Sequence, residues 1–307
     1  MTALVSVIIP AYNCAATIAA TLNSACGQHH SNLEILVIDD GSQDDTAATV
    51  LALADSDPRI QYLAFPNGGP AIARNRGIEK AQGQFIAFLD ADDLWTPDKI
   101  TAQLAALAGH PQAGLAYSWI DWIDEAGQFL RPGSHIQASG NVLEALILRN
   151  FIDNGSNVLV RKEVFAQVGT FNPDLPPSED WDLWLRIAGT YEFICVPQVQ
   201  VLYRISPSSL SSSNVERLAQ VGLTILINIF RQYPELEAKI GRQALADKYR
   251  YFTFKSIEGR PSRKNGRLAW RFFTKALILE PRWWTQRGKV LAVVLAKATK
   301  FSLGPKA

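Results

Sequence analysis

The residues best suited to chemistry stand at the end of an apolar run, "FIAFLDADDLW", residues 85–95. Asp90, Asp92 and Asp93 place three carboxylates within four positions. Two carboxylates one residue apart on an extended segment lean to one side, and each raises the pKa of the other unless a cation lies between them. Carboxylate oxygens favour Mg²⁺ or Mn²⁺, which take one or two protein carboxylates plus phosphate oxygens. The spacing therefore indicates a divalent metal that neutralises a diphosphate.

The same acids also fit a structural role. Asp92 or Asp93 could cap a helix that begins near Trp95, because a carboxylate accepts hydrogen bonds from the free amides of a helix start. An isolated Asp-x-Asp pattern does not separate the two interpretations, so its surroundings have to decide.

The elements that position these acids alternate along the chain. Four β-branched runs are almost continuously apolar, as parallel strands covered on both faces are: 4–10, 33–39, 60–65 and 84–90. Helical stretches follow them at 15–28, 45–54, 70–81 and 97–108. The alternation predicts an α/β domain, a three-layer sandwich with a mostly parallel sheet.

Ligands of such sheets bind beyond the carboxyl ends of the strands. Polar turns follow three of the predicted strands: Pro10-Ala11-Tyr12-Asn13, Asp39-Asp40-Gly41-Ser42 and the acids after residue 89. Because these ends share one edge, we expect a single site there. For Asp39 and Asp40 an acidic turn without a ligand is an equal alternative.

The pattern loosens after Ala113. A strand is expected at 113–124, a strand and helix at 155–169 and a helix at 178–189. The serine-rich stretch 206–214 is the best linker, which predicts a domain at 1–213 and a helical region at 214–307.

The end of that helical region is basic and aromatic. Its amphipathic stretch carries Trp270, Phe272, Phe273, Trp283, Trp284 and Leu291 among lysines and arginines. Two interpretations remain open: a helical hairpin packed on the first domain, or helices that make peripheral contact with an anionic membrane.

Composition narrows the class of protein. Thirty basic and twenty-nine acidic residues among 307 leave a net charge of +1, so no nucleic-acid partner is expected. Three separated cysteines indicate a reducing compartment. The first residues lack a signal peptide, and no apolar stretch approaches the ~20 residues of a membrane span. These features predict a cytoplasmic protein, peripheral at the inner face of the membrane if the C-terminal helices bind lipid.

Six segments in order carry a more specific signal: "SVIIPAYN", "LEILVIDDGSQDDT", "NGGPAIARNRGI", "GQFIAFLDADDLWTPDK", "GSNVLVRKEVFAQVGTFN" and "SEDWDLWLRI". Together they resemble the family-two glycosyltransferases with a GT-A fold. The resemblance implies inverting transfer of a sugar from a nucleotide diphosphate donor, a UDP- or dTDP-sugar, to a hydroxyl of a glycan, a lipid-linked or another acceptor. It also implies Mn²⁺ or Mg²⁺ as cofactor and a role in cell-surface polysaccharide or glycoconjugate synthesis.

The resemblance also assigns roles by position. On the donor side, the turn Pro10, Ala11, Tyr12 and Asn13 lies against the nucleotide, and Asp40, beside Asp39, hydrogen-bonds the uracil or thymine ring. Arg74 approaches the phosphates or the sugar, Asp90 lies near the ribose or donor sugar, and Asp92 binds the metal. Asp93 is then expected to start the following helix, where its charge meets the positive end of the helix dipole.

On the acceptor side the resemblance points to Glu179, Asp180 and Trp181. Asp180 is the expected general base, with its pKa raised by Glu179 and Asp182. The alternative is that Asp180 only caps the helix that follows. Trp181 could stack on a sugar, whereas Trp184 is expected in the core.

One position departs from the family. Relatives often carry a metal-binding or diphosphate-binding histidine shortly after a Tyr-Arg pair, and here Ser206 stands in its place. Two alternatives follow: the metal is held more loosely here, or Arg204 meets phosphate charge instead. The four histidines, His29, His30, His110 and His135, are expected at the surface.

Three rival classes fit less well. A dinucleotide-binding oxidoreductase needs G-x-G-x-x-G where this chain has "PAYNCAAT", and a nucleotidyltransferase needs a glycine-rich first loop with Arg and Lys. A catalytically degenerate domain kept for sugar-nucleotide binding or scaffolding is the remaining alternative. Acids at 40, 90, 92 and 180 argue against it.

Overall fold

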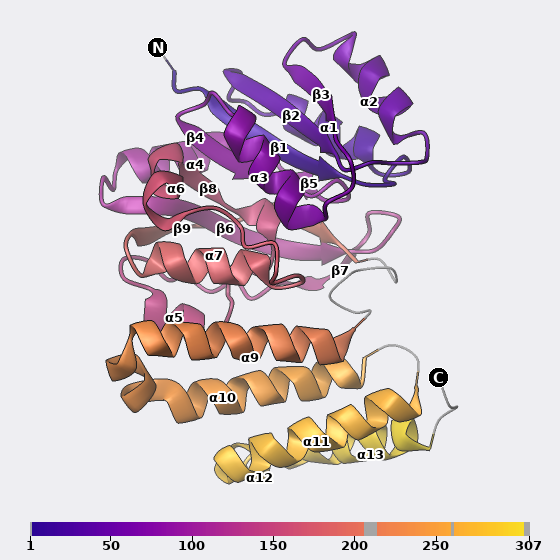
Figure 1. The fold of residues 1–307 in the computed structure, drawn as a ribbon, viewed down its shortest axis with the longest axis vertical. Helices are drawn as coiled ribbons and strands as arrows, with labels where there is room; N and C mark the ends of the chain where they lie inside the picture. Colours follow the sequence, from indigo (N-terminus) through magenta and orange to yellow (C-terminus); the bar gives the residue numbers. More distant parts are fainter. Residues whose placement is uncertain (1, 206–213, 259–260, 304–307) are drawn as a thin grey trace. The chain divides into compact units, whose positions relative to one another are not determined.

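The computed structural model describes residues 2–205, 214–258 and 261–303 (Figure 1). The chain forms two compact units, one of residues 1–143 and 150–206 and one of residues 144–149 and 207–307. The predicted domain boundary at 213/214 falls at the edge of a stretch outside the described residues.

The first unit is built on one nine-stranded sheet. The strands are β1 (Val5–Ala11), β2 (Leu33–Asp39), β3 (Ile60–Ala64), β4 (Phe85–Phe88), β5 (Leu94–Trp95), β6 (Ala113–Ile123), β7 (Phe129–Pro132), β8 (Leu159–Arg161) and β9 (Glu192–Arg204). The order is β3-β2-β1-β4-β8-β6-β9-β5, with β7 beside β6. The first four strands in this order are parallel, β8 is antiparallel to both of its neighbours, and β9 is parallel to β6.

Helices cover both faces of this sheet. They are α1 (Ile18–Cys26), α2 (Thr46–Ala54), α3 (Pro70–Lys80), α4 (Lys99–Ala108), α6 (Lys162–Val168) and α7 (Glu179–Ala188), with a short 3₁₀ turn η1 (Gly155–Asn157) before β8. Side chains of α1, α2 and α4 join one core cluster with alternate residues of β1 and β2. On the other face Gly77 of α3 lies against Ile8, and Trp184 of α7 packs near Phe88. The predicted α/β three-layer sandwich is confirmed.

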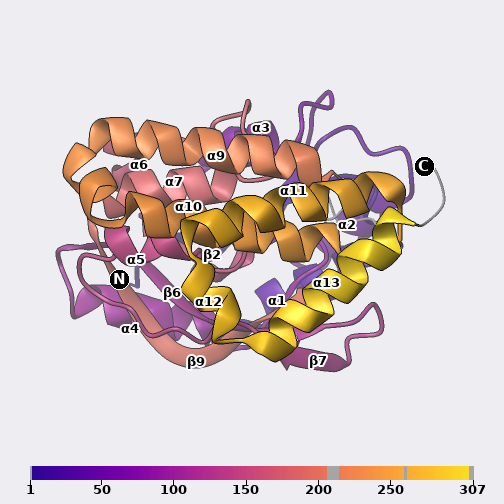
Figure 2. The same ribbon diagram turned by 90° about the horizontal axis from the view of Figure 1, so that it is seen from below.

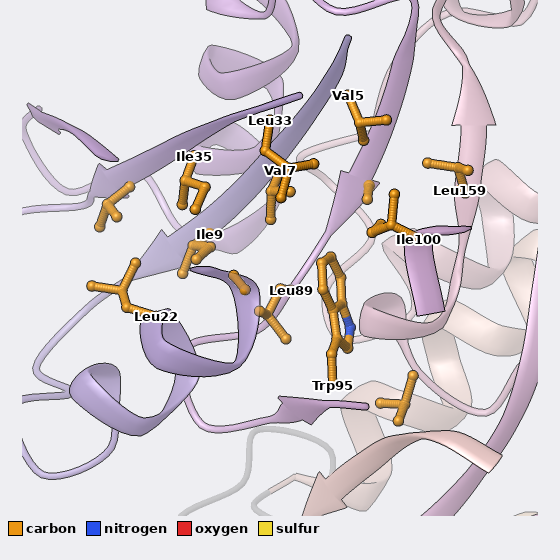
Figure 3. Packing of buried hydrophobic residues seen from close by; sticks show 14 of the residues in the cluster. Val5, Val7, Ile9, Leu22, Leu33, Ile35, Leu89, Trp95, Ile100 and Leu159 are labelled. Carbon is orange, nitrogen blue, oxygen red and sulfur yellow. The ribbon is translucent and has the colours of Figure 1, made fainter. Parts of the chain in front are cut away.

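The core explains why the parallel strands read as continuously apolar. Val5, Val7 and Ile9 of β1 point to the face that bears Leu22 of α1 (Figure 3). Ile8 between them is equally buried on the opposite face. Both faces of β1 are therefore covered, as parallel sheets require.

The structure differs from the expected elements at two places. Trp95, placed at a helix start, belongs to β5, and α4 begins only at Lys99. The 13-residue strand β9 was not predicted at all, although it pairs with β6 along most of its length. Its apolar and polar residues alternate only in part, and several of them are half-exposed, so its sequence lacks the regular period of a strand.

The second unit is helical. It contains most of α5 (Leu143–Leu148), together with α9 (Val215–Gln232), α10 (Pro234–Ser256), α11 (Arg263–Leu279), α12 (Pro281–Thr285) and α13 (Gly288–Ser302). Helix α10 packs against α9 and α11, and α11 packs against α13 (Figure 2). In the described part of the chain, no helix combines the length and apolar character needed to cross a bilayer.

Candidate active site

The three aspartates after β4 have three different environments. Asp93 is completely buried, and its carboxylate accepts hydrogen bonds from Ser156 Oγ at 2.5 Å, Asn154 Nδ2 at 2.8 Å and the Arg204 amide at 3.0 Å. The expectation that Asp93 starts a helix is therefore wrong. It instead ties the acidic turn to η1 and to the end of β9.

Asp92 lies next to Asp93 but lacks such partners. Among the described residues, none other than Asp92 itself donates a hydrogen bond to its carboxylate, while Arg204 Nε donates to its backbone carbonyl at 2.8 Å. Burial, and then the charge of Asp90, raise the pKa of Asp92 to about 6. A carboxylate in this situation is stabilised by any cation that reaches it.

Arg74 joins two acids that are far apart in the sequence. From α3, its Nη2 donates to Asp90 Oδ1 at 2.6 Å and its Nη1 to Glu179 Oε1 at 2.9 Å, with only 8% of the side chain exposed. A Cβ at Gly155 would lie 3.6 Å from Arg74 Nη2, so η1 closes over the pair. The structure thus brings α3, the end of β4 and the start of α7 to one place.

Two buried polar atoms of this cluster remain without a partner. They are Arg74 Nε and Glu179 Oε2, for which the described residues provide no hydrogen bond. Buried polar atoms without partners are rare in proteins and often mark functional sites.

Asp180 occupies the first turn of α7, directly after Glu179. Its Oδ1 accepts a hydrogen bond from the amide of Trp181 at 2.6 Å, and Ser178 rather than Asp180 is the N-cap residue. Burial, and then the negative charge of Glu179, raise the pKa of Asp180 to about 7. Asp182 does not contribute as expected, because it pairs with Arg186 on the same helix.

The two tryptophans of α7 are both in the core. Trp184 is fully buried against Phe88 and Phe171, as expected. Trp181 is only 3% exposed, so its ring presents no free face to a sugar in this structure, and of the two roles left open for it the core position is the one observed.

The turn after β2 is held by its own neighbours. Asp40 Oδ1 accepts from the Gly68 amide at 2.8 Å and from Arg76 Nη1 at 3.0 Å, and its Oδ2 accepts from the Gly69 amide at 2.7 Å. Asp39 accepts from the Ser42 amide at 2.8 Å and from the Tyr62 hydroxyl at 2.5 Å. Both carboxylates are almost fully buried and anchor the loops after β2 and β3.

The turn after β1 is tied to the turn after β2. Pro10 and Ala11 are the last residues of β1, and the Ala11 carbonyl accepts from the Asp40 amide at 2.8 Å. Asn13 has a positive φ of 48°, and its side-chain oxygen accepts from the Gln43 amide at 2.7 Å. Tyr12, 53% exposed, leaves its ring free at this edge.

Arg204 makes three contacts that the sequence did not suggest. Besides the Asp92 carbonyl, its guanidinium donates to the carbonyls of Asp124 at 3.0 Å and Glu125 at 2.7 Å. It therefore ties the acidic turn to residues 124–125, and the suggestion that it meets phosphate charge stays a prediction. Ser206 lies outside the described residues.

No ready-made metal cage is found: within residues 2–205, 214–258 and 261–303, no three His, Cys, Asp or Glu side chains gather around a common point. Two of the four histidines, His29 and His110, are exposed as expected. His30 and His135 are half-buried instead, and His135 is paired with Asp121 at 2.9 Å and stacked on Trp119.

Residues 6–256 match the model of a family described as glycosyltransferase like family 2. The chain belongs to this family. The predicted recognition as a family-two glycosyltransferase is thereby confirmed.

This family-two glycosyltransferase has relatives of known and unknown substrate. It is 32% identical over 225 residues to the Escherichia coli UDP-Glc:alpha-D-GlcNAc-diphosphoundecaprenol beta-1,3-glucosyltransferase WfgD. The match covers 70% of this chain and 82% of WfgD. It is 35% identical over 188 residues to an uncharacterized glycosyltransferase of Rickettsia conorii. That match covers 60% of this chain but only 31% of the rickettsial protein, so the chain spans about a third of that relative's length.

Solved structures share the fold. S. aureus TarS 1–349, in complex with UDP-GlcNAc, superposes with a TM-score of 0.67 at 18% identity and covers 97% of this chain and 89% of that chain. The Pyrobaculum calidifontis mannosyltransferase PcManGT, in complex with GDP-Man and Mn2+, superposes with a TM-score of 0.61 at 20% identity. The match covers 97% of this chain and 86% of PcManGT. The predicted GT-A-like fold with a C-terminal helical region is confirmed by these likenesses.

The residues that hold the acids in place were not predicted from the sequence. Asn154, Gly155 and Ser156 form the loop over Asp90 and Asp93, and Ser156 Oγ also accepts from the Asp90 amide at 2.9 Å. The available signal was three small polar residues in a row before an apolar strand, which is typical of a loop that approaches other backbone closely.

Proposed function

We propose that this protein transfers a sugar from a UDP- or dTDP-linked donor to an acceptor hydroxyl with inversion at the anomeric carbon, in the synthesis of a cell-surface polysaccharide or glycoconjugate. The observation that carries the proposal is the Arg74 bridge. It links Asp90, beside the metal-binding candidate Asp92, to Glu179, beside the candidate base Asp180. The lipid-linked glycan acceptor and UDP-Glc donor named for WfgD support the chemistry.

The nucleotide end of the proposed site lies beyond β1 and β2. A carboxylate has about four acceptor positions, and three of those on Asp40 are already used by Gly68, Gly69 and Arg76. The remaining position matches the single imide N–H of uracil or thymine, and because Asp40 is only 3% exposed the base would reach it only at the edge of the loops after β2 and β3. The exposed ring of Tyr12, with the backbone of Pro10–Asn13, provides a surface for the nucleotide.

The residues present fit a divalent metal. Asp92 has a carboxylate to which none of the other described residues donates a hydrogen bond, and Asp90 has one oxygen, Oδ2, that Arg74 does not use. One or two carboxylates are the protein share that Mg²⁺ or Mn²⁺ needs when phosphate oxygens complete its coordination. When bound, the metal supplies positive charge that stabilises the leaving diphosphate.

Asp180 is the proposed base. Its carboxylate takes the proton of the acceptor hydroxyl as that oxygen forms the new bond to the anomeric carbon, while the bond from this carbon to the diphosphate oxygen breaks on the opposite side. A pKa of about 7 allows Asp180 to be ionised near neutral pH yet basic enough to hold the proton. Glu179, paired with Arg74, keeps its place beside it.

The competing function is a degenerate domain that binds a sugar nucleotide without turnover. It predicts donor binding with no metal-dependent chemistry. The raised pKa values of Asp92 and Asp180 favour an active site, because perturbed carboxyls gathered beside a buried arginine are typical of catalytic centres.

A donor screen tests the proposal. UDP, dTDP, GDP and their common sugars are added with or without Mn²⁺, and thermal unfolding and hydrolysis of the sugar nucleotide are followed. A ligand at 100 times its Kd stabilises the folded state by about 2.7 kcal/mol, which is readily seen as a rise in Tm. We expect a rise with a uridine or thymidine donor that needs Mn²⁺, together with slow hydrolysis. Binding without any metal-dependent hydrolysis would favour the degenerate domain, and no stabilisation by any donor would contradict both.

A further inference from the structure

Positive charge is concentrated at the end of the chain. Residues 263–303 contain ten lysines and arginines but one acid, Glu280, in a chain whose total charge is only +1. Glu280 is itself paired with Arg250 of α10. Helices α11 to α13 are therefore strongly cationic, and the rest of the chain is net acidic.

Helix α13 presents part of this charge in one stripe. Lys289, Val293, Ala296, Lys300 and Leu303 follow one another at spacings of three or four residues, and all five are exposed. This spacing places them on one face of an α-helix. Val294, Ala298 and Phe301 lie on the opposite, buried face.

Helix α11 has a matching outward stripe. Arg267, Arg271, Thr274 and Ile278 are exposed at the same spacing, and Phe272, Phe273 and Ala276 of the same helix are buried. The two helices touch closely, because a Cβ on Gly266 would lie 2.2 Å from the Ser302 amide nitrogen. Figure 2 shows that the two helices lie close together at one end and spread apart toward α12. The two stripes together are called the α11–α13 face.

Aliphatic side chains stand among these cations. Ile278, Val293 and Leu303 are 70%, 54% and 77% exposed. The aromatic residues considered for membrane contact are mostly used inside the unit instead: Trp284 is fully buried, and Trp283 is covered by the guanidinium groups of Arg250 and Arg287. The apolar part of the α11–α13 face is thus aliphatic.

We propose that the α11–α13 face docks on an anionic lipid surface. Lysines and arginines meet the lipid phosphates, and Ile278, Val293 and Leu303 enter the boundary between headgroups and acyl chains. A nucleic acid would also attract the cations, but it offers nothing to cover exposed aliphatic side chains, so lipid is the better match. The inference concerns binding alone, and it joins the proposed function only through a lipid-linked acceptor.

Vesicle flotation with the full chain tests this inference. The probes are phosphatidylcholine vesicles and vesicles with a third phosphatidylglycerol, at 0.1 and 0.5 M NaCl. The charge variant is Arg271→Glu with Lys289→Glu and Lys300→Glu, three exposed positions. Its matched control makes the same charge change at Lys80, Arg149 and Arg231, which are exposed elsewhere. A third variant, Ile278→Ser with Val293→Ser, keeps the charge.

We expect wild type to float with anionic vesicles only, and to be released at 0.5 M NaCl, where surface charges are largely screened. Each cation near such a surface strengthens binding to the vesicle about fivefold, so the charge variant should bind at least 10²-fold more weakly than wild type. The control variant should bind within a fewfold of wild type. The serine variant should bind anionic vesicles about tenfold more weakly than wild type at 0.1 M NaCl. This loss comes from the missing apolar contact, because the charge of the face is unchanged.

Three results would overturn the inference. They are absence of wild-type flotation with anionic vesicles, equal loss in the charge and control variants, and tighter binding of a short DNA duplex than of vesicles at equal phosphate. Circular dichroism shows whether each variant is folded. UDP–Mn²⁺ stabilisation measured on the same samples separates the two proposals, since vesicle binding without nucleotide binding leaves this inference standing and removes the proposed function.

Discussion

Asp92 and Asp93 are neighbours in sequence, yet the fold satisfies only one of them. Asp93 accepts three hydrogen bonds, whereas Asp92 has no partner among the other described residues and faces the charge of Asp90. Residues kept in such a state commonly lower the stability of the free protein in exchange for function. This asymmetry could not be read from the sequence, in which the two aspartates differ by one position.

Asp92→Asn is therefore expected to stabilise the ligand-free protein at pH 8, by on the order of 1 kcal/mol, because it removes a charge that burial and Asp90 disfavour. The sign follows from linkage. The folded-state pKa of about 6 lies above the unfolded value, so the folded state holds more protons between the two values, and stability falls as pH rises through that window. Urea unfolding at pH 5 and pH 8 measures the effect, and it should shrink at pH 5.

The same substitution should abolish Mn²⁺-dependent turnover. Asp55→Asn, at an exposed position beyond α2, is the control and should change neither property. Full activity of Asp92→Asn with Mn²⁺ would remove Asp92 from the metal site.

Asp180→Asn tests the base. The amide keeps the shape and can still accept from the Trp181 amide, so the fold and UDP binding should survive. Turnover should fall by roughly 10²-fold or more, the usual size of a general-base contribution. In wild type, kcat/KM should rise with pH through about 7 and then level, because Asp180 must lose its proton to act. A variant that turns over acceptor at near wild-type rate would contradict the assignment.

At the scale of elements, the sequence predicted what local periodicity and parallel geometry determine. The strands β1, β2 and β4 and their polar turns were placed correctly, because each is a short apolar run followed by acids or turn residues. It could not show which side chains meet across long separations. Arg74 and Glu179 are 105 positions apart, and no periodicity links them. Nor could it decide the burial of Trp181, because both tryptophans of α7 fit an amphipathic helix.

Arg74 is where three elements depend on one side chain. Arg74→Lys keeps the charge but loses the fork that reaches both Asp90 and Glu179, so one buried carboxylate is left unpaired. Breaking a buried pair costs about 3–5 kcal/mol, and we expect a loss of this order in the free energy of unfolding. Arg76→Lys on the same helix is the control and should cost less, because Arg76 is more exposed. Equal losses in the two variants would show that the bridge has no special weight.

At the scale of the whole molecule, the two compact units allow one unit to be destabilised while ligand binding is measured in the other. Gly266 approaches the backbone of Ser302 so closely that Gly266→Ala must displace α13 from α11. We expect faster proteolysis within α11–α13, with UDP–Mn²⁺ stabilisation of the first unit unchanged. Gly288→Ala, where a Cβ meets nothing within 4 Å, is the matched control. Resistance of Gly266→Ala to proteolysis would mean that the contact is not tight.

The path of the chain between the units has a consequence for synthesis on the ribosome. Residues 144–149 belong to the helical unit, yet the chain returns to the first unit for residues 150–206 before the other helices follow. Glu144 of α5 pairs with Lys239 of α10, nearly a hundred residues later. At about 5–20 residues per second, α5 waits on the order of 5–20 s for that partner. A nascent chain stopped at residue 213 would therefore expose α5 before the other helices of its unit have been synthesised. Chaperones could bind α5 at that stage but not in the completed protein.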